Sequence, residues 1–222
     1  MRLLLVEDDE ELTTSLRRDL EQAGYAVDIA ATGVEGEYMG DEGTYDIAIL
    51  DLGLPDRNGL DVLRNWRTGS NPLPVIILTA RHDWQERIEG FQAGADDYVG
   101  KPFYTEELIA RIKALINRSQ GQQPGGKLQG GGLKLDEETR EVITEDGNRQ
   151  MLTNTEFRLL RYLLLNPDKV LSKSKLTEHV YDFDSDKDSN VIEVYIKYLR
   201  DKIGKDKIET RRGQGYVFRG KG

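Results

Sequence analysis

The sequence predicts an α/β domain, doubly wound around a parallel sheet of five strands, followed by a smaller α+β domain. Three observations lead to this prediction. Short apolar runs alternate with helical patterns through the first half of the chain. The run Ile47–Leu50 is apolar throughout, which is typical of a strand covered on both faces of a sheet. A Gly-rich stretch, 119–132, separates this half from a second half of different charge.

The elements of the first half are expected to alternate as five strands and five helices. Each strand is a short apolar run, and each helix carries apolar residues at spacings of three and four. The expected strands are Leu3–Val6, Tyr25–Ala30, Ile47–Leu50, Pro74–Thr79 and Tyr98–Val99. The expected helices are Leu12–Leu20, Val34–Met39, Leu60–Trp66, Gln85–Ala93 and Thr105–Arg118.

The stretch 119–132 is predicted to be a flexible linker between a domain of residues 1–118 and a domain of residues 133–222. It contains six Gly and one Pro, and Leu128 is its only large apolar residue. Such a composition cannot form a packed core of its own.

Residues 133–222 predict a winged helix-turn-helix, because three helical patterns follow strand-like runs and precede a terminal hairpin pattern. The first helix is expected to begin at a capping box, Thr153–Glu156, and to end before Pro167. Ser172 is a candidate cap for the second helix. The strand-like runs are Leu133–Leu135, Glu141–Thr144 and Met151-Leu152, the last preceded by an Asp146-Gly147 turn. The second helix is expected over Lys173–Val180. An acidic loop, Asp182–Asp188, then precedes the third helix, Asn190–Ile203. The hairpin strands are Lys207–Arg211 and Tyr216–Arg219.

Composition excludes several classes of site. The chain of 222 residues has no Cys, so disulfides and thiolate metal sites are excluded. Its start reaches Glu7-Asp8 after four apolar residues, too few for a signal peptide or a membrane span. We therefore expect a soluble, cytoplasmic protein without a membrane partner.

Charge is distributed unevenly along the chain. Residues 1–120 carry 12 Lys and Arg against 23 Asp and Glu, whereas residues 121–222 carry 19 against 17. The last stretch, 189–222, carries nine against four. Different partners for the two halves would explain this distribution, although ordinary surface variation remains an alternative.

Polar residues follow four of the predicted strands of the first domain. They are Glu7, Asp8 and Asp9 after the first strand, Asp51 after the third, Thr79 at the end of the fourth and Lys101 after the fifth. The carboxyl ends of parallel strands meet at one edge of a sheet, where crowded carboxylates favour a cation such as Mg²⁺. Asp51 is then a plausible nucleophile that forms an aspartyl phosphate. Thr79 and Lys101 could bind the phosphoryl group.

Simpler interpretations exist for each residue alone. An acidic pair after a strand often serves a helix N-terminus, a lone Asp often caps a turn, and Lys101 before Pro102 could be a solvated lysine. Only the conjunction favours a phosphoryl site. A haloacid-dehalogenase-like phosphatase needs an acidic residue two positions after its nucleophile, where this chain has Gly53. A dinucleotide-binding enzyme needs a Gly-rich first turn, which is absent.

Residues 1–118 resemble the receiver domain of bacterial two-component response regulators, which has the CheY-like (flavodoxin-like) fold. The resemblance is carried by VEDD (6–9), DLGLPDRNG (51–59), LTAR (78–81) and GADDYVGKPF (94–103). It implies that Asp51 accepts a phosphoryl group contacted by Thr79 and Lys101, and that Tyr98 is a switch that turns inward with Thr79. The implied Mg²⁺ ligands are Glu7 through water, Asp8, Asp51 and the Gly53 carbonyl.

The second half resembles the winged-helix effector of the OmpR/PhoB-type subfamily, and within it PhoP- and PmrA-like regulators. The motifs are LTNTEFRLLRYLL (152–164), NVIEVYIKYLRDKIG (190–204) and IETRRGQGYVF (208–218). The resemblance implies that helix 190–203 enters the major groove of promoter DNA and that Arg212 enters the minor groove. Candidate DNA contacts are Asn190, Val194, Tyr195, Lys197, Tyr198, Arg200, Thr210, Arg211 and Arg212. Alternatively, the basic residues merely solvate the helix.

The resemblance also implies a two-fold dimer of phosphorylated receivers through the fourth helix, fifth strand and fifth helix. Expected cross-dimer pairs are Arg87 with Glu107, Asp96 with Arg111, and Asp97 with Arg118, unless these are separate surface charges. We expect a transcription regulator phosphorylated by a sensor histidine kinase, binding direct-repeat promoter DNA, with RNA polymerase a possible partner. It would be no enzyme beyond its own phosphotransfer and dephosphorylation. A phosphate-independent receiver that only dimerises is the alternative.

Overall fold

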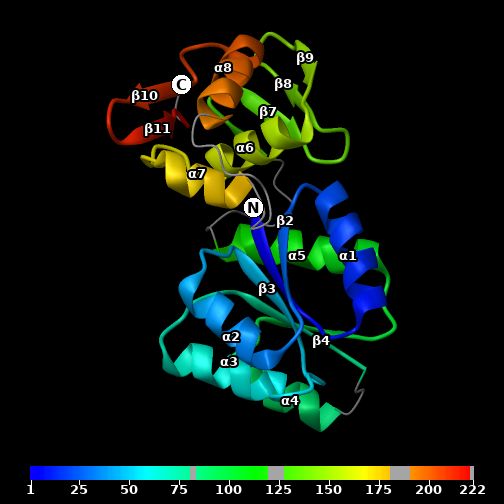
Figure 1. Ribbon diagram of the computed structural model, residues 1–222. Coiled ribbons are helices and arrows are strands. Elements are labelled where there is room, and N and C mark those ends of the chain that lie inside the picture. The colour runs from blue at the N-terminus through cyan, green and yellow to red at the C-terminus, as the bar shows by residue number, and fades with distance from the viewer. Residues whose placement is uncertain (81–83, 120–127, 181–190, 221–222) are drawn as a thin grey trace. The chain divides into compact units, whose positions relative to one another are not determined.

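The computed structural model describes residues 1–80, 84–119, 128–180 and 191–220. The chain divides into two compact units, one mainly of residues 2–124 and the other mainly of residues 125–222 (Figure 1). The predicted acidic loop, 182–188, lies outside the described residues. Within the described ranges, no helix has the length and apolar character required to cross a membrane.

The first unit is the predicted doubly wound domain. Its sheet has five strands in the order β2-β1-β3-β4-β5, and α1 packs beside α5 while α2 packs beside α3 (Figure 1). The strands are β1 (Arg2–Val6), β2 (Ala26–Ala30), β3 (Ile47–Asp51), β4 (Val75–Thr79) and β5 (Asp97–Gly100). The helices are α1 (Glu10–Gln22), α2 (Gly33–Glu42), α3 (Gly59–Thr68), α4 (Trp84–Gln92) and α5 (Thr105–Ser119). The predicted fold class is confirmed.

The core of this unit explains why the three central strands are mainly apolar. Every residue of β1, β3 and β4 is buried, because helices cover both faces of the sheet. Trp66 of α3 is fully buried in this core, and its Nε1 donates a 3.1 Å hydrogen bond to the Glu37 carbonyl of α2. A Cβ on Gly40 of α2 would lie 2.4 Å from the Trp66 ring, so this close helix packing requires glycine.

The parallel register aligns the carboxyl ends of the strands. Val6 pairs with Leu50, Asp51 pairs with Leu78, and Thr79 pairs with Gly100. The residues that follow β1, β3, β4 and β5 therefore emerge at one edge of the sheet.

The second unit is a winged helix-turn-helix preceded by a four-stranded antiparallel sheet. The sheet consists of β6 (Leu128–Gly130), β7 (Leu133–Asp136), β8 (Glu141–Ile143) and β9 (Arg149–Met151). It is followed by α6 (Asn154–Leu165), α7 (Lys173–Val180), α8 (Val191–Ile203) and the hairpin of β10 (Ile208–Arg211) and β11 (Gly215–Phe218). The expected three helices and terminal hairpin are confirmed.

The end of the predicted linker differs from the structure. Leu128 is buried and pairs with Leu135, so β6 begins before residue 133. A single Leu among glycines forms no alternating pattern, and only pairing with β7 makes it a strand. Residues 120–127 of the predicted linker lie outside the described residues.

Both predicted helix caps of the second unit are present. Thr153 and Glu156 form the capping box at the start of α6, and Ser172 Oγ accepts a 3.1 Å hydrogen bond from the Lys175 amide of α7. Glu156 is buried and also binds Lys202 of α8, whose Nζ lies 2.8 Å from Glu156 Oε2. This bond joins the first and third helices of the winged-helix fold.

Candidate functional site

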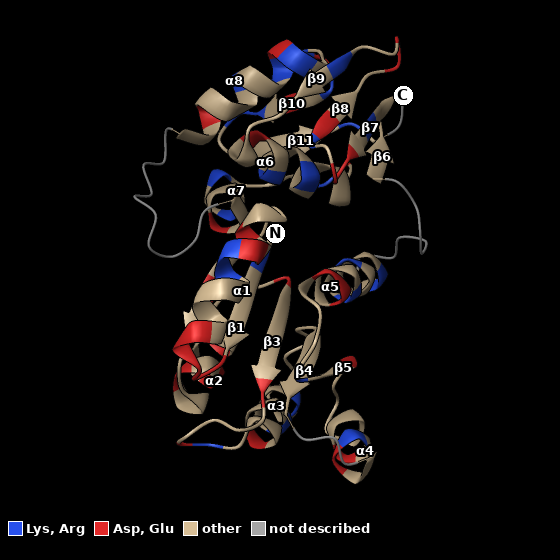
Figure 2. Cartoon of the chain, turned by 90° about the vertical axis from the view of Figure 1, so that its right-hand side faces the viewer, with Lys and Arg blue, Asp and Glu red and all other residues tan. Residues whose placement is uncertain are grey.

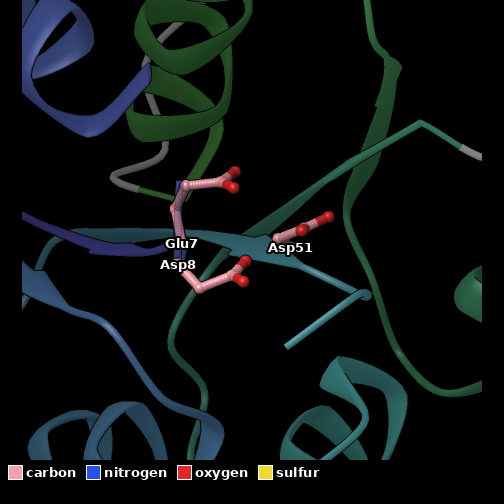
Figure 3. Close-up of side chains that lie close together, drawn as sticks. All are labelled: Glu7, Asp8 and Asp51. Atoms are coloured by element: carbon pink, nitrogen blue, oxygen red, sulfur yellow. The ribbon is translucent and has the colours of Figure 1, made fainter. Parts of the chain in front are cut away.

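Three carboxylates meet at the edge of the first unit's sheet. Oxygen atoms of Glu7, Asp8 and Asp51 all lie within 4.8 Å of one another (Figure 3). Because Val6 pairs with Leu50, the residues that follow β1 emerge beside the end of β3. Glu7 is 2% exposed and Asp51 7% exposed, whereas Asp8 is exposed. The cluster is therefore buried on one side and open to solvent at Asp8.

Lys101 partly compensates the charge of this cluster. Its Nζ lies 2.6 Å from Glu7 Oε2 and 3.4 Å from Asp51 Oδ2. Burial raises the pKa of Glu7, and although the hydrogen bond from Lys101 lowers it, the pKa remains above the usual value. Proximity to Asp51 also raises the pKa of Glu7. The carboxylates therefore carry more negative charge than one lysine relieves, and a further cation would be favourable here.

Thr79 and Lys101 are held at the same edge by the β4–β5 pairing. Thr79 is buried at the end of β4, and its carbonyl accepts a 2.7 Å hydrogen bond from the Lys101 amide. Tyr98 lies buried on β5, and the guanidinium carbon of Arg87 lies 5.5 Å from the centre of its ring. The fold thus brings together residues from four strand ends that are up to 94 positions apart.

The loop after β3 turns sharply around Asp51. The Leu52 amide donates a 2.8 Å hydrogen bond to Asp51 Oδ1. Gly59 approaches so closely that a Cβ there would lie 2.1 Å from the Asp51 carbonyl oxygen. Asn58 caps α3 by accepting a 2.9 Å hydrogen bond from the Leu60 amide. Gly53, within this loop, is exposed, which leaves room for a ligand beside it.

Asp56 is a residue of this loop whose role was missed in the sequence analysis. Its two carboxylate oxygens accept hydrogen bonds of 2.7 Å and 3.0 Å from the amides of Gly33 and Val34, at the start of α2. The motif DLGLPD contains Asp56, but no local pattern indicates that its partner is a helix 22 residues earlier.

The donor set fits a Mg²⁺ ion. Its candidate side-chain ligands are oxygen atoms only, from two buried carboxylates and an exposed one. Mg²⁺ prefers carboxylate and water oxygens, and an open side leaves room for waters and a phosphate. The excess of negative charge beyond that of Lys101 supports the same assignment.

Four of the six residues predicted for a dimer surface, Asp96, Asp97, Glu107 and Arg111, form ion pairs within one chain. Arg111 of α5 binds Asp97 at 3.0 Å and Glu107 at 2.8 Å. Asp96 binds Arg67 of α3 at 3.3 Å and accepts a 2.9 Å hydrogen bond from the Val75 amide. Beside them Arg87, Glu107 and Arg118 are exposed, as are Ile88 and Phe91 of α4 at 46% and 48%.

The predicted faces of α8 are present in the second unit. Ile192, Ile196, Leu199 and Ile203 are buried, whereas Val194, Lys197 and Tyr198 are exposed and Tyr195 is half-buried. The last turn of α8 is basic (Figure 2). At the hairpin, Thr210, Arg211 and Arg212 are exposed, and Arg211 binds Glu209 at 3.0 Å. Asn190 lies outside the described residues.

Arg200 departs from the expectation that it faces solvent or DNA. Its guanidinium donates hydrogen bonds to the Ile208 carbonyl, 3.0 Å from Nε, and to Thr210 Oγ1, 2.8 Å from Nη2. These bonds satisfy the group inside the domain and tie α8 to β10. The helical pattern could not predict this, because the acceptors belong to the hairpin.

Comparisons with known proteins agree with both units. Residues 3–113 match the family described as response regulator receiver domain, and residues 147–218 match transcriptional regulatory protein, C terminal. The chain is 42% identical to the two-component response regulator PhoP of Pseudomonas aeruginosa, covering 98% of each chain. It is 42% identical to the transcriptional regulatory protein PmrA of Pectobacterium parmentieri, covering 98% of this chain and 97% of that one.

Solved structures of receiver domains are similar to the first unit. The receiver domain of the Francisella response regulator 1452 is similar with a TM-score of 0.52 and 31% identity, over 53% of this chain and 98% of that one. The CheY-like receiver domain protein from Methanospirillum hungatei is similar with a TM-score of 0.52 and 30% identity, over 54% and 96%. Together with the acidic edge and the winged helix, these matches show that the chain belongs to the two-component response regulators, as a transcription regulator with an OmpR/PhoB-type DNA-binding domain.

Proposed function

We propose that this response regulator is switched by phosphorylation of Asp51 and that the switch controls dimerisation and binding to promoter DNA. One observation carries the proposal: Glu7, Asp8, Asp51 and Lys101 converge at one sheet edge, buried on one side and open on the other. Burying several carboxylates costs free energy of folding, so a receiver that no longer took part in phosphoryl transfer would be more stable without this cluster.

The chemistry follows from the arrangement of the side chains. A carboxylate oxygen of Asp51 attacks the phosphorus of a phosphohistidine on the sensor kinase, the P–N bond breaks, and a P–O bond to Asp51 forms. Lys101, 3.4 Å from Asp51, then pairs with the phosphoryl oxygens, and the Thr79 hydroxyl donates to one of them. Asp8, Asp51 and the Gly53 carbonyl, with Glu7 through a water, would hold a Mg²⁺ ion, which would supply positive charge to offset that of the phosphoryl group. Hydrolysis of the acyl phosphate resets the switch, so catalysis is confined to the protein's own phosphorylation state.

The proposed output requires a bistable element, because a charge of about −1.5 to −2 at Asp51 cannot by itself act over a long distance. Tyr98 and Thr79 form this element, and α4, β5 and α5 form the dimer surface. Exposed Ile88 and Phe91 supply apolar contact at this surface. Arg111 pairs with Asp97 and Glu107 within one chain, and in the dimer these three residues form ion pairs with the second subunit instead. Two effector domains joined in a dimer then bind direct-repeat sites in promoter DNA more tightly than one effector domain does. This binding takes place in the cytoplasm, where RNA polymerase is a possible partner.

Sedimentation of the full-length protein with Mg²⁺, before and after addition of beryllofluoride as a substitute for the phosphoryl group, tests the proposal. We expect a shift from monomer to dimer that Asp51→Ala abolishes. Asp61→Ala is the matched control, since Asp61 is an exposed carboxylate of α3 that pairs with Arg64. A dimer that forms equally in the Asp51→Ala variant would favour the phosphate-independent receiver instead.

A further inference from the structure

We infer that Asp56 is a positioning residue for the metal site, because it ties the loop that carries the Gly53 carbonyl to the start of α2. The inference rests on the proposed function, since the position of Gly53 matters only if this edge binds Mg²⁺. Asp56 itself would contact neither the metal nor the phosphoryl group.

The contact between Asp56 and α2 is a paired one. Oδ1 accepts from the Gly33 amide at 2.7 Å and Oδ2 accepts from the Val34 amide at 3.0 Å. Gly33 and Val34 are the first residues of α2, where amides lack partners within the helix and the helix dipole favours an anion. The Val34 amide, and then the Gly33 amide, hold the pKa of Asp56 below its usual value. The carboxylate therefore stays ionised and bound through the physiological range.

A second bond fixes the same end of the loop. Arg57 forms an ion pair with Glu37 of α2, and Glu37 also accepts a 3.0 Å hydrogen bond from Asn65 Nδ2 of α3. The helix approaches so closely that a Cβ on Gly33 would lie 2.8 Å from the Arg57 carbonyl oxygen. Asp56 and Arg57 thus join the loop to α2 at two consecutive positions.

The other side of the loop is fixed to the phosphoacceptor strand. The Leu52 amide binds Asp51 Oδ1 at 2.8 Å, and the Gly59 amide binds the Leu52 carbonyl at 3.2 Å. The segment from Gly53 to Pro55 is therefore held between Asp51 on one side and Asp56 on the other. Releasing Asp56 gives this segment conformational freedom that must be lost again when the Gly53 carbonyl binds an ion.

Calorimetric titration of the full-length protein with MgCl₂ tests the inference. Asp56→Asn keeps the size of the side chain but replaces one acceptor with a donor facing an amide. We expect its dissociation constant for Mg²⁺ to rise about three- to tenfold, less than the roughly 10–100-fold typical of residues that hydrogen-bond directly to a metal-coordinating side chain. Asp56→Glu keeps the carboxylate and should recover part of the affinity.

Two controls separate positioning from simple capping of α2. Thr32 caps the same helix by accepting a 3.2 Å hydrogen bond from the Glu35 amide, and in the part of the chain that the structure describes its side chain has no hydrogen bond to the loop 52–58. Thr32→Ala and Asp56→Asn should both lower the melting temperature by a few degrees, but Thr32→Ala should change the Mg²⁺ dissociation constant less than twofold. Asp61→Asn removes the same charge from an exposed position of α3 and should also leave Mg²⁺ binding unchanged.

The outcomes are distinct. A rise confined to Asp56→Asn supports the inference. Equal effects of Asp56→Asn and Thr32→Ala would show that Asp56 only stabilises α2, and an unchanged dissociation constant in Asp56→Asn would overturn the inference directly. If the wild-type protein bound no Mg²⁺, the proposed metal site would fail, and the positioning role would fail with it.

Discussion

Lys101 donates a 2.6 Å hydrogen bond to Glu7, which is closer to its ammonium group than the proposed phosphoacceptor, Asp51, at 3.4 Å. The lysine therefore serves first as the counter-ion of a buried glutamate. A metal ion that neutralises Glu7 and Asp51 would release it to pair with a phosphoryl group.

Replacing Lys101 with Met should destabilise the receiver most strongly when metal is absent. Glu7 is buried and would lose its counter-ion, so we expect a loss of about 1–3 kcal/mol in the free energy of unfolding. Saturating Mg²⁺ should reduce this loss, because the ion replaces the lysine charge. Urea unfolding in EDTA and in MgCl₂, followed by tryptophan fluorescence, measures both values, since Trp66 and Trp84 both lie in the receiver. Lys113→Met is the control, and an equal loss in both buffers would contradict the interpretation.

The stability of the effector should depend on pH through Glu156. Burial opposes ionisation of this carboxyl, but hydrogen bonds from Lys202 and Thr153 outweigh burial, so the pKa of Glu156 lies below its usual value. A lowered pKa stabilises the fold above the unfolded-state pKa, roughly 4.3, and this contribution is lost as the pH falls through the folded-state pKa.

Glu156→Gln should therefore reduce the unfolding free energy by about 1–2 kcal/mol at pH 7, and the difference from wild type should shrink as the pH falls below the unfolded-state pKa and vanish below the folded-state pKa. Circular dichroism follows both units and tryptophan fluorescence follows the receiver alone, so the change should appear in the circular dichroism transition and not in the fluorescence transition. Glu138→Gln, at an exposed position, is the control. A difference that persists at low pH would indicate lost packing rather than lost charge.

Arg200 and Arg212 should affect DNA binding in different ways. Arg212 is exposed at the wing, so Arg212→Ala should weaken DNA binding. The slope of log affinity against log salt concentration should also fall in magnitude by about 1, the value expected for the loss of one phosphate contact. Arg200 is bound to β10, so Arg200→Lys should weaken binding by loosening the wing while leaving the slope unchanged. Titrations at several salt concentrations, on a duplex selected by the protein from random sequences, compare the two. A reduced slope in Arg200→Lys would mean that Arg200 contacts phosphate itself.

A charge reversal should test the dimer surface. Arg87 and Glu107 are both exposed, and the ion pair with Arg111 that Glu107→Arg removes is a weak surface one, so neither substitution should disturb the fold. Arg87→Glu places like charges opposite each other at two symmetric positions, and the beryllofluoride-induced dimer should weaken by roughly tenfold. Adding Glu107→Arg should restore the dimer, as measured by sedimentation. Failure of the double variant to recover would place these side chains outside the interface.

The sequence by itself determined the order of the elements and the chemistry at the strand ends. Apolar runs such as Ile47–Leu50 and helical spacings such as that of Ile192 and Ile196 are local patterns, and the residues that form these patterns are the ones that are buried in the structure. Parallel strands must deliver their carboxyl ends to one edge, so the meeting of Asp8 with Asp51 was predictable without coordinates.

Only the tertiary structure decided which partners the polar side chains choose. Lys101 binds Glu7 more closely than Asp51, Arg200 binds β10, and Asp56 binds the start of α2. In the same way, the segment that begins at Leu128 forms a strand only because Leu128 pairs with Leu135. Each choice depends on two segments approaching within hydrogen-bonding or packing distance. Such an approach is set by the packing of whole elements, and no local spacing encodes it.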